Sequence, residues 1–221
     1  MNIFDIIGPV MIGPSSSHTA GAVRIGRVVN KVLDGKNPDK VEITLSGSFA
    51  QTYKGHGTDR ALLAGIMGFH SYSPEIRDAL TIAKERNIDY SFRCENIRDA
   101  HPNTASIKFY TGNEEGVVQG ASVGGGNIIV DMINGMKVSF TGENNTLLVI
   151  HKDRPGVISN VTNLMHFKHE ELNIANFRLS RQKKGGDAIM IIEIDNMPPS
   201  DLIGELRELE NVTNALFIRK L

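Results

Sequence analysis

The chain has 221 residues, of which 40% are hydrophobic, and its formal net charge at pH 7 is −1. This length can bury one or two ordinary cores, and two are favoured because domains cluster near about 100 to 150 residues. A nearly neutral chain gives no electrostatic case for binding nucleic acid or an anionic membrane surface.

The sequence also indicates a compartment and a redox state. No apolar run approaches the roughly 20 residues that span a bilayer, and Met1–Gly13 lacks the basic region and long apolar segment of a signal peptide. We therefore expect a cytoplasmic protein.

Cys94 is the single cysteine, so it cannot form an internal disulfide or supply the several thiolates of an iron–sulfur cluster. The alternating pattern of Tyr90–Cys94 favours a small core residue over an iron ligand or a nucleophile.

The segment Gly13–Thr19, with the sequence GPSSSHT, places three serines, a histidine and a threonine just before an apolar helix. The helix is predicted from apolar residues at i, i+3 and i+4 spacing: Ile25, Val28, Val29, Val32 and Leu33. Hydroxyls and backbone N–H groups at a helix start suit a carboxylate or a phosphate. The alternative is a plain Ser/Thr-rich N-cap, but His18 within the cap favours an anion site.

A second histidine-bearing segment follows the expected strand Val41–Leu45. Tyr53–Asp59, with the sequence YKGHGTD, is expected to form a loop that leads into an apolar helical segment, Ala61–Met67. Thr58 or Asp59 is the candidate N-cap of that helix, because both side chains can accept a backbone N–H.

His56 lies at the centre of this second segment. The glycines on both sides of it would let a ligand approach the backbone, and Lys54 adds a positive charge. A loop histidine is more often structural than catalytic, but two such segments in one chain favour a shared site.

The rest of the first half predicts one further helix and then strands. Ser73-Pro74-Glu75 combines an N-cap, a proline at the first helical position and an acidic first turn. Alternating apolar residues then predict strands near residues 105–109, 117–123, 128–133 and 136–140. Asn134-Gly135 is a strong hairpin signal between the last two strands.

A polar run, Thr141–Asn145, predicts a domain boundary, with domains at residues 1–141 and 146–221. Hydrophobic periodicity after it predicts the order strand, helix, strand, strand, helix, strand, which is the ferredoxin-like βαββαβ arrangement. The predicted fold class of the chain is therefore α+β. The motif Asp153–Gly156, with the sequence DRPG, falls at the first strand-to-helix turn of the second domain.

Three segments together resemble the β chain of the iron–sulfur-dependent L-serine dehydratases (L-serine ammonia-lyases). They are GPSSSHTAG near the N-terminus, GSFAQTYKGHGTD after the first strand, and the stretch from Asn145 onward. The resemblance covers nearly the whole chain. It implies an N-terminal serine-dehydratase β-type domain, which resembles allosteric substrate-binding domains of some phosphoglycerate dehydrogenases, and a C-terminal ACT domain.

The resemblance also implies a reaction and a partner. The family converts L-serine to pyruvate and ammonia with a [4Fe-4S] cluster instead of pyridoxal phosphate, and a separate α subunit or domain ligates the cluster. No metal is then expected on this chain. Dehydration removes the proton on Cα, for which an imidazole is a suitable base, and expels hydroxide from Cβ, for which the partner's iron is a suitable Lewis acid.

Residue roles follow from the same resemblance. His56 and His18 are the expected catalytic residues, with His56 as the base, although the two roles could be reversed. The expected substrate-binding residues are Ser15, Ser16, Ser17, Thr19, Lys54, Gly55 and Thr58. In the C-terminal domain, Asp153, Arg154, Pro155 and Gly156 match the ACT signature. In related domains this signature binds small amino acids. The alternative is that the domain only holds subunits together, because this fold hosts many unrelated functions.

Two other functions compete with this one. The chain could be a non-catalytic, amino-acid-sensing regulatory module that binds L-serine, or a sensing domain of a dehydrogenase; Gly55–Arg60 lacks the dinucleotide fingerprint of such an enzyme. His166 and His169, with Glu170 and Glu171, have the spacing of metal ligands. Histidines are typical of a solvated helix C-terminus, so we expect no metal there.

Overall fold

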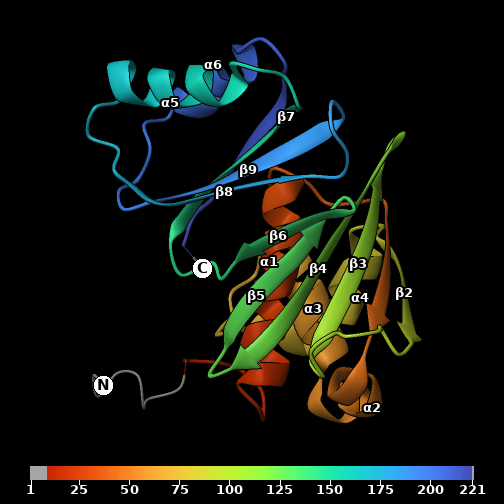
Figure 1. Ribbon diagram of the computed structural model, residues 1–221. Coiled ribbons are helices and arrows are strands. Elements are labelled where there is room, and N and C mark those ends of the chain that lie inside the picture. The colour runs from red at the N-terminus through yellow and green to blue at the C-terminus, as the bar shows by residue number, and fades with distance from the viewer. Residues whose placement is uncertain (1–8, 221) are drawn as a thin grey trace. The chain divides into compact units, whose positions relative to one another are not determined.

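The computed structural model describes residues 9–220 and contains two sheets with helices, which confirms the α+β class. The chain divides into two compact units, with the division between Asn134 and Gly135. Figure 1 shows the course of the chain. Strand β6 (Met136–Phe140) follows this division and is the last strand of the larger sheet, and the predicted domain boundary at Thr141–Asn145 comes after it.

The larger sheet has six strands in the order β2-β1-β3-β4-β5-β6. The first five strands in chain order are β1 (Lys40–Leu45), β2 (Asp89–Cys94), β3 (Thr104–Thr111), β4 (Glu114–Gly124) and β5 (Asn127–Ile133). β1 runs parallel to β2 and antiparallel to β3, and the β3–β4 and β4–β5 pairs are antiparallel. A parallel pair needs a long crossover, and the helices between β1 and β2 provide it.

Helices cover one face of this sheet (Figure 1). They are α1 (Ala22–Val32), α2 (Gly47–His56), α3 (Thr58–Ile66), a 3₁₀ helix (Pro74–Asp78) and α4 (Ala79–Glu85). α1 and α3 pack closely, because two glycines meet at their crossing. A Cβ on Gly26 would collide with the carbonyl oxygen of Leu62, and one on Gly65 would collide with that of Val23.

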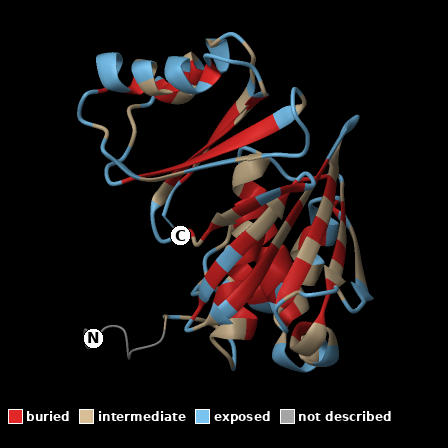
Figure 2. Ribbon diagram, viewed as in Figure 1, coloured by how far each residue is buried: buried red, intermediate tan, exposed pale blue. Residues whose placement is uncertain are grey.

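Burial follows the predicted periodicities (Figure 2). Along β1, the alternate residues Val41, Ile43 and Leu45 are buried, as expected for a sheet with one covered face. On α1, Ile25, Val28 and Val29 are fully buried, whereas Val32 and Leu33 at the helix end are only partly buried.

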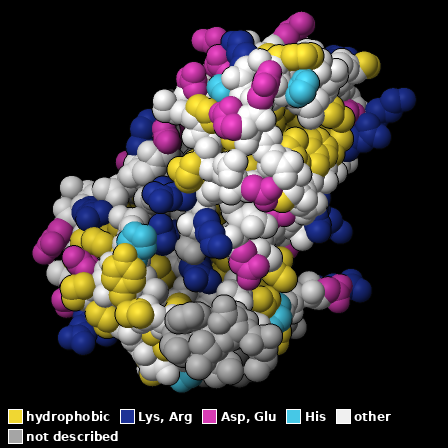
Figure 3. Space-filling view, turned by 90° about the vertical axis from the view of Figure 1, so that its left-hand side faces the viewer, with side chains coloured by type: hydrophobic (Ala, Val, Ile, Leu, Met, Phe, Trp, Pro, Cys, Tyr) yellow, Lys and Arg dark blue, Asp and Glu magenta, His cyan; other side chains and the backbone are white. Residues whose placement is uncertain are grey.

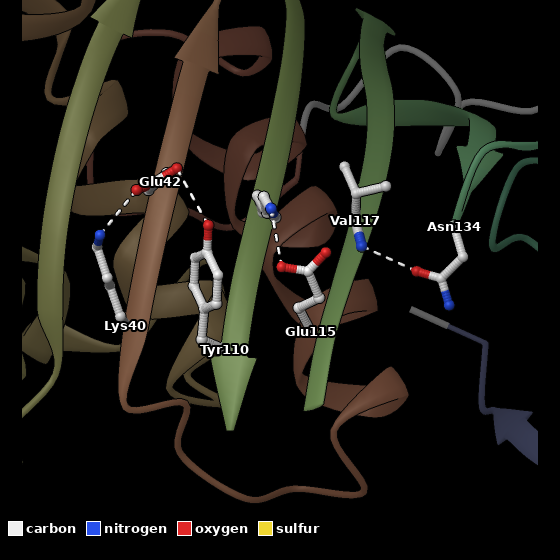
Figure 4. Close-up of polar contacts among 7 residues, drawn as sticks. Lys40, Glu42, Tyr110, Glu115, Val117 and Asn134 are labelled. Carbon is white, nitrogen blue, oxygen red and sulfur yellow. Dashed lines mark hydrogen bonds and ion pairs between the residues drawn. The ribbon is translucent and has the colours of Figure 1, made fainter. Parts of the chain in front are cut away.

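Polar side chains of β1, β3 and β4 form a network on the larger sheet (Figure 4). Lys40 forms an ion pair with Glu42 at 2.8 Å, and the Tyr110 hydroxyl donates to Glu42 at 3.4 Å. Lys108 forms an ion pair with Glu115 at 2.9 Å. Partly exposed pairs of this kind contribute little to stability, so the apolar, helix-covered face holds the unit together.

The surface carries both signs of charge. Figure 3 shows acidic and basic side chains on the same face, together with hydrophobic ones. In the part of the chain that the structure describes, no helix has the length and apolar character needed to cross a membrane.

The second unit contains the predicted order of strand, helix, strand, strand, helix, strand. The elements are β7 (Asn145–Lys152), α5 (Val157–Lys168), β8 (Ile174–Arg181), β9 (Asp187–Ile194), α6 (Leu202–Glu208) and β10 (Val212–Ile218). The sheet order is β10-β7-β9-β8, and all neighbouring pairs are antiparallel. Both helices lie on one face of this sheet (Figure 1), and the core between them includes Leu147, Val161, Met190 and Leu206.

Two expectations about single residues are wrong. Cys94 is exposed rather than buried, because it ends β2, which is the edge strand of the larger sheet. His169 is buried rather than solvated, and its Nε2 lies 2.8 Å from a carboxylate oxygen of Glu205 on α6. Its position after the end of α5 was predicted, but the pairing with α6 depends on packing that sequence periodicity does not specify.

Candidate functional site

His18 lies in a π-helical turn, Ser17–Gly21, that runs directly into α1. The helix start is therefore at the predicted place. The Ser15 hydroxyl lies 3.4 Å from the backbone nitrogen of His18, whereas the N-cap residue Ser16 makes no side-chain capping bond. The first motif thus serves partly as a cap, and it also directs the His18 side chain into the protein, where only 6% of the residue is exposed.

Three hydroxyls surround the His18 ring. The Ser15 Oγ lies 3.3 Å from Nδ1, and the Thr52 Oγ1 lies 3.0 Å from Nε2. The Ser48 Oγ is also near Nε2, at 3.4 Å, and the Phe49 ring contacts the imidazole edge-on with centroids 5.1 Å apart. Because Ser48, Phe49 and Thr52 all belong to α2, this helix fixes the position of the ring.

The second motif is not the predicted loop. Residues 47–56 form α2, and His56 is its last residue. Gly57 adopts a left-handed backbone conformation with φ of 70°, which ends α2 and allows α3 to begin at Thr58. Neither Thr58 nor Asp59 is the N-cap, because Gly57 occupies that position. The motif therefore joins two helices, and the flexible glycine is at the junction.

His18 and His56 are brought together by this arrangement. Their ring centroids are 4.6 Å apart and the ring planes cross at 86°. Burial lowers the pKa of His18, the nearby charge of His56 lowers it further, and a hydrogen bond with the Ser48 backbone opposes both effects. His56 is exposed. The pair thus combines a buried neutral imidazole with one that faces solvent.

A pocket of about 330 Å³ adjoins His56. It is lined by Ile12, Gly13, Pro14, Thr19, Lys54, Gly55, His56, Gly57, Arg60, Ile76 and Arg77. Three of these residues are cationic, and none of the described lining residues is acidic. The excess of positive charge suits an anionic ligand, and the planar guanidinium groups of Arg60 and Arg77 match a carboxylate in particular.

The predicted substrate-binding residues divide into three groups. Thr19, Lys54 and Gly55 line the pocket, and Ser15 instead contacts His18. Ser16 and Ser17 are half-buried beside them and do not line it. Thr58 is fully buried, and among the described residues its hydroxyl has no hydrogen-bond partner.

Four polar or charged residues of the site were not predicted from the sequence: Ser48, Thr52, Arg60 and Arg77. One signal for the first two was available. Ser48, Thr52 and His56 are spaced four residues apart, so a helical interpretation of this segment places them on one face. Arg60 and Arg77 are brought to the pocket by α3 and the 3₁₀ helix, and no spacing in the sequence relates them.

The DRPG motif of the second unit forms a separate hollow. The Asp153 carboxylate accepts hydrogen bonds from the Gly185 backbone at 2.9 Å and from Arg181 at 2.7 Å, and these bonds, the first above all, lower its pKa. All four residues of the motif, Asp153, Arg154, Pro155 and Gly156, line a pocket of about 450 Å³ with Ile158, Arg181, Lys184 and Gly185. Asp153 is thus engaged in holding the turn.

The residues present do not fit an iron–sulfur cluster. Such clusters take about four cysteine thiolates, and this chain has only Cys94. Within residues 9–220, no group of three or more His, Cys, Asp or Glu side chains is placed to hold a metal ion.

The sequence was compared with known proteins. A family model described as "Serine dehydratase beta chain" matches residues 2–132. The chain is 41% identical over 211 residues to the "Probable L-serine dehydratase, beta chain" of Bacillus subtilis (strain 168), covering 96% of this chain and 94% of that protein. It is 39% identical over 217 residues to the "L-serine dehydratase, beta chain" of Peptoniphilus asaccharolyticus, covering 97% and 96%.

A more distant similarity involves another enzyme. The chain is 28% identical over 203 residues to the "D-3-phosphoglycerate dehydrogenase" of Methanocaldococcus jannaschii, covering 89% of this chain but 37% of that protein. The family match and the two β chains of nearly equal length decide the classification: this chain belongs to the serine dehydratase beta chain family.

Proposed function

We propose that this chain is the β subunit of an L-serine dehydratase and that it acts with an α subunit to convert L-serine to pyruvate and ammonia. The observation that carries the proposal is the His18–His56 pair beside a cationic pocket. This arrangement provides a base and an anion site next to each other, which an amino-acid substrate requires. The relatives named as L-serine dehydratase β chains support the choice of substrate.

The carboxylate of L-serine binds in the pocket between Lys54, Arg60 and Arg77. All three side chains line it, and Gly55 lets the backbone approach the ligand because no side chain covers it. A carboxylate bound to cationic donors is held by charge-assisted hydrogen bonds, which are about twice as strong as neutral ones. This anchor orients the Cα of serine relative to His56, which lines the same pocket.

His56 is the base that takes the proton from Cα. Its ring is exposed, so the proton it accepts can pass to water after each turnover. As that proton leaves Cα, the bond between Cβ and the hydroxyl oxygen breaks and hydroxide departs, which gives aminoacrylate. Aminoacrylate then hydrolyses to pyruvate and ammonia. His18 stays neutral beside His56, because burial and the charge of His56 lower the pKa of His18.

The [4Fe-4S] cluster belongs to the α subunit in this proposal, and pyridoxal phosphate is not required. The lone Cys94 of this chain does not fit such a cluster, so we assign none of its ligands here. The pocket is bounded on one side by residues of the first unit, and the α subunit completes it.

Residues 146–221, which lie within the second unit, act as an ACT domain in this proposal, and residues 1–141 form the substrate-binding domain. Arg154, Pro155 and Gly156 border the hollow in which a small amino acid would bind. The strand and helix order and the antiparallel sheet support this assignment.

One alternative function is favoured by a specific observation. The similarity to a phosphoglycerate dehydrogenase extends over 89% of this chain, so both units occur together in an enzyme of another name. A non-catalytic module that senses L-serine would explain that pairing. Isothermal titration with L-serine separates the two functions. A sensor binds serine without any partner, whereas a β subunit binds weakly alone and more tightly once the α subunit completes the pocket.

A further inference from the structure

The hydroxyl proton of Thr52 is used in a hydrogen bond within helix α2. Thr52 lies one turn after Ser48 on α2, and its hydroxyl donates to the Ser48 carbonyl oxygen at 2.8 Å. A hydroxyl has a single proton, so Thr52 Oγ1 can only accept a hydrogen bond from its second neighbour, the Nε2 of His18 at 3.0 Å. The proton of the neutral His18 ring therefore lies on Nε2.

The other ring nitrogen is consequently an acceptor. His18 is 6% exposed, and burial together with the charge of His56 lowers its pKa, so the neutral form predominates at neutral pH. A neutral imidazole with a proton on Nε2 has its lone pair on Nδ1. The Ser15 Oγ lies 3.3 Å from Nδ1, so the Ser15 hydroxyl donates its proton there.

We propose that Thr52 is a positioning residue that holds His18 as the Nε2–H tautomer and thereby orients the Ser15 hydroxyl as a hydrogen-bond acceptor for the α-ammonium group of the amino-acid substrate. The inference rests on the proposed function, because it concerns the same site. Ser15 directly follows Pro14, which lines the cationic pocket.

The orientation of Ser15 separates the two ends of the substrate. The Ser15 hydroxyl donates its proton to His18 Nδ1 and accepts the His18 backbone N–H at 3.4 Å, so only its second lone pair is left for a ligand. That lone pair repels a carboxylate and accepts an N–H. The carboxylate is left to Lys54, Arg60 and Arg77. Ser15, which the sequence suggested as one of several anion donors, thus becomes the residue that recognises the positive end of an amino acid.

The tautomer is measured by nitrogen NMR on the full chain, labelled with ¹⁵N in its histidine rings, at about pH 8, where histidine with its ordinary pKa near 6.5 is neutral. The spectrum of His18→Gln identifies the His18 signals. We expect Nε2 in the protonated range and Nδ1 in the unprotonated range. A proton found on Nδ1 in the wild-type chain overturns the inference without any variant.

Two substitutions test the role of Thr52. Thr52→Val keeps the shape but removes the hydroxyl, so we expect His18 to lose its single tautomer, and Thr52→Ser should keep it. Thr162→Val is the matched control, because Thr162 on α5 makes the same hydroxyl bond to the carbonyl four residues earlier, that of Ile158. Unchanged His18 signals in Thr52→Val would show that Thr52 does not position the ring.

Kinetics of the complex with the α subunit then test the consequence for the substrate. We expect Thr52→Val to raise the KM for L-serine about fivefold to tenfold, with the Thr52→Ser value near wild type. An unchanged KM in Thr52→Val would contradict the assignment of Ser15 to the ammonium group. Absence of any serine turnover by the wild-type complex contradicts the proposed function, whereas the NMR result decides the tautomer by itself.

Discussion

The rings of His18 and His56 cross at 86° with their centroids 4.6 Å apart, and they come from two motifs separated by helix α1, strand β1 and the first half of helix α2. One ring is held among the hydroxyls of Ser15, Ser48 and Thr52, and the other ends α2 at the edge of a cationic pocket. The pair thus joins a fixed, neutral imidazole to a solvent-facing one, and the proposed mechanism gives the role of base to the solvent-facing ring.

Replacement of His56 should abolish most of the activity. Loss of a general base typically lowers the rate by about 100-fold to 10,000-fold, so we expect His56→Gln to reduce kcat in that range with the complex intact. Pyruvate formation from L-serine measures it. His166→Gln is the control, because His166 is an exposed histidine at the end of α5. Near-normal turnover in His56→Gln would remove this residue from the base role.

Removal of positive charge from the pocket should weaken substrate binding more than it slows chemistry. Arg77→Gln and Arg60→Gln each take away a guanidinium that lines the pocket, and we expect the KM for L-serine to rise about tenfold. Arg98→Gln serves as the control, since the Arg98 side chain is 95% exposed and its ion pair with the neighbouring Asp99, at 3.5 Å, is exposed as well. A fall in kcat with an unchanged KM would place the carboxylate elsewhere.

Stability should fall as the pH is lowered, and His18 should account for part of the fall. The pKa of His18 in the folded chain lies below its ordinary value of 6.5, so below that pH the unfolded chain binds a proton that the folded chain does not. The contribution of His18 to the free energy of unfolding is therefore fully present above pH 6.5. It is lost as the pH falls towards the pKa of His18 in the folded chain.

Urea unfolding at about pH 7.5 and about pH 5.5 checks this dependence, with histidine titrating between these values. The difference between the two conditions should be smaller in His18→Gln than in the wild-type chain. Burial also lowers the pKa of His70, so a residual dependence is expected in the variant. An identical pH dependence in both proteins would show that His18 titrates as it does in the unfolded chain.

The helix pair that supports the site should not tolerate a methyl group at its crossing. Gly26→Ala would place a Cβ against the carbonyl oxygen of Leu62, and overpacking of this kind costs about 1–3 kcal/mol. Gly204→Ala in α6 is the matched control, because its Cβ would meet nothing within 4 Å. Alanine at position 204 should stabilise the chain by about 0.5–1 kcal/mol. Urea unfolding should therefore show a lower free energy of unfolding for Gly26→Ala and a higher one for Gly204→Ala than for the wild-type chain.

Periodicity was sufficient to predict most of the fold. The strands near Val41–Leu45 and residues 105–140, the α5 and α6 helices and the order of the second unit follow from alternation, apolar stripes and turn residues. The error fell on Tyr53–His56, where the glycines and polar residues suggested a loop. These residues continue α2, because the helix is held by the fully buried Phe49, whose ring contacts His18, and because the left-handed turn that ends it comes only at Gly57.

The site was predicted only in part for a related reason. His18, His56, Lys54 and Thr19 stand out in the sequence because they lie in two dense motifs. The remaining contributors do not: Thr52 is a polar residue just before the predicted loop Tyr53–Asp59, and Arg77 is one of many exposed arginines. Their roles arise from helix packing, which places distant residues around one pocket and which spacing within a motif does not encode.

Pyruvate formation from L-serine by the affinity-purified chain, isolated anaerobically from its native cells with and without the proteins that accompany it, tests the central claim most directly. We predict turnover only in fractions that contain a second, cysteine-rich chain with the colour of an iron–sulfur cluster. Tight binding of L-serine by the isolated chain, with no partner and no pyruvate from any fraction, would contradict the account and make the chain a sensor.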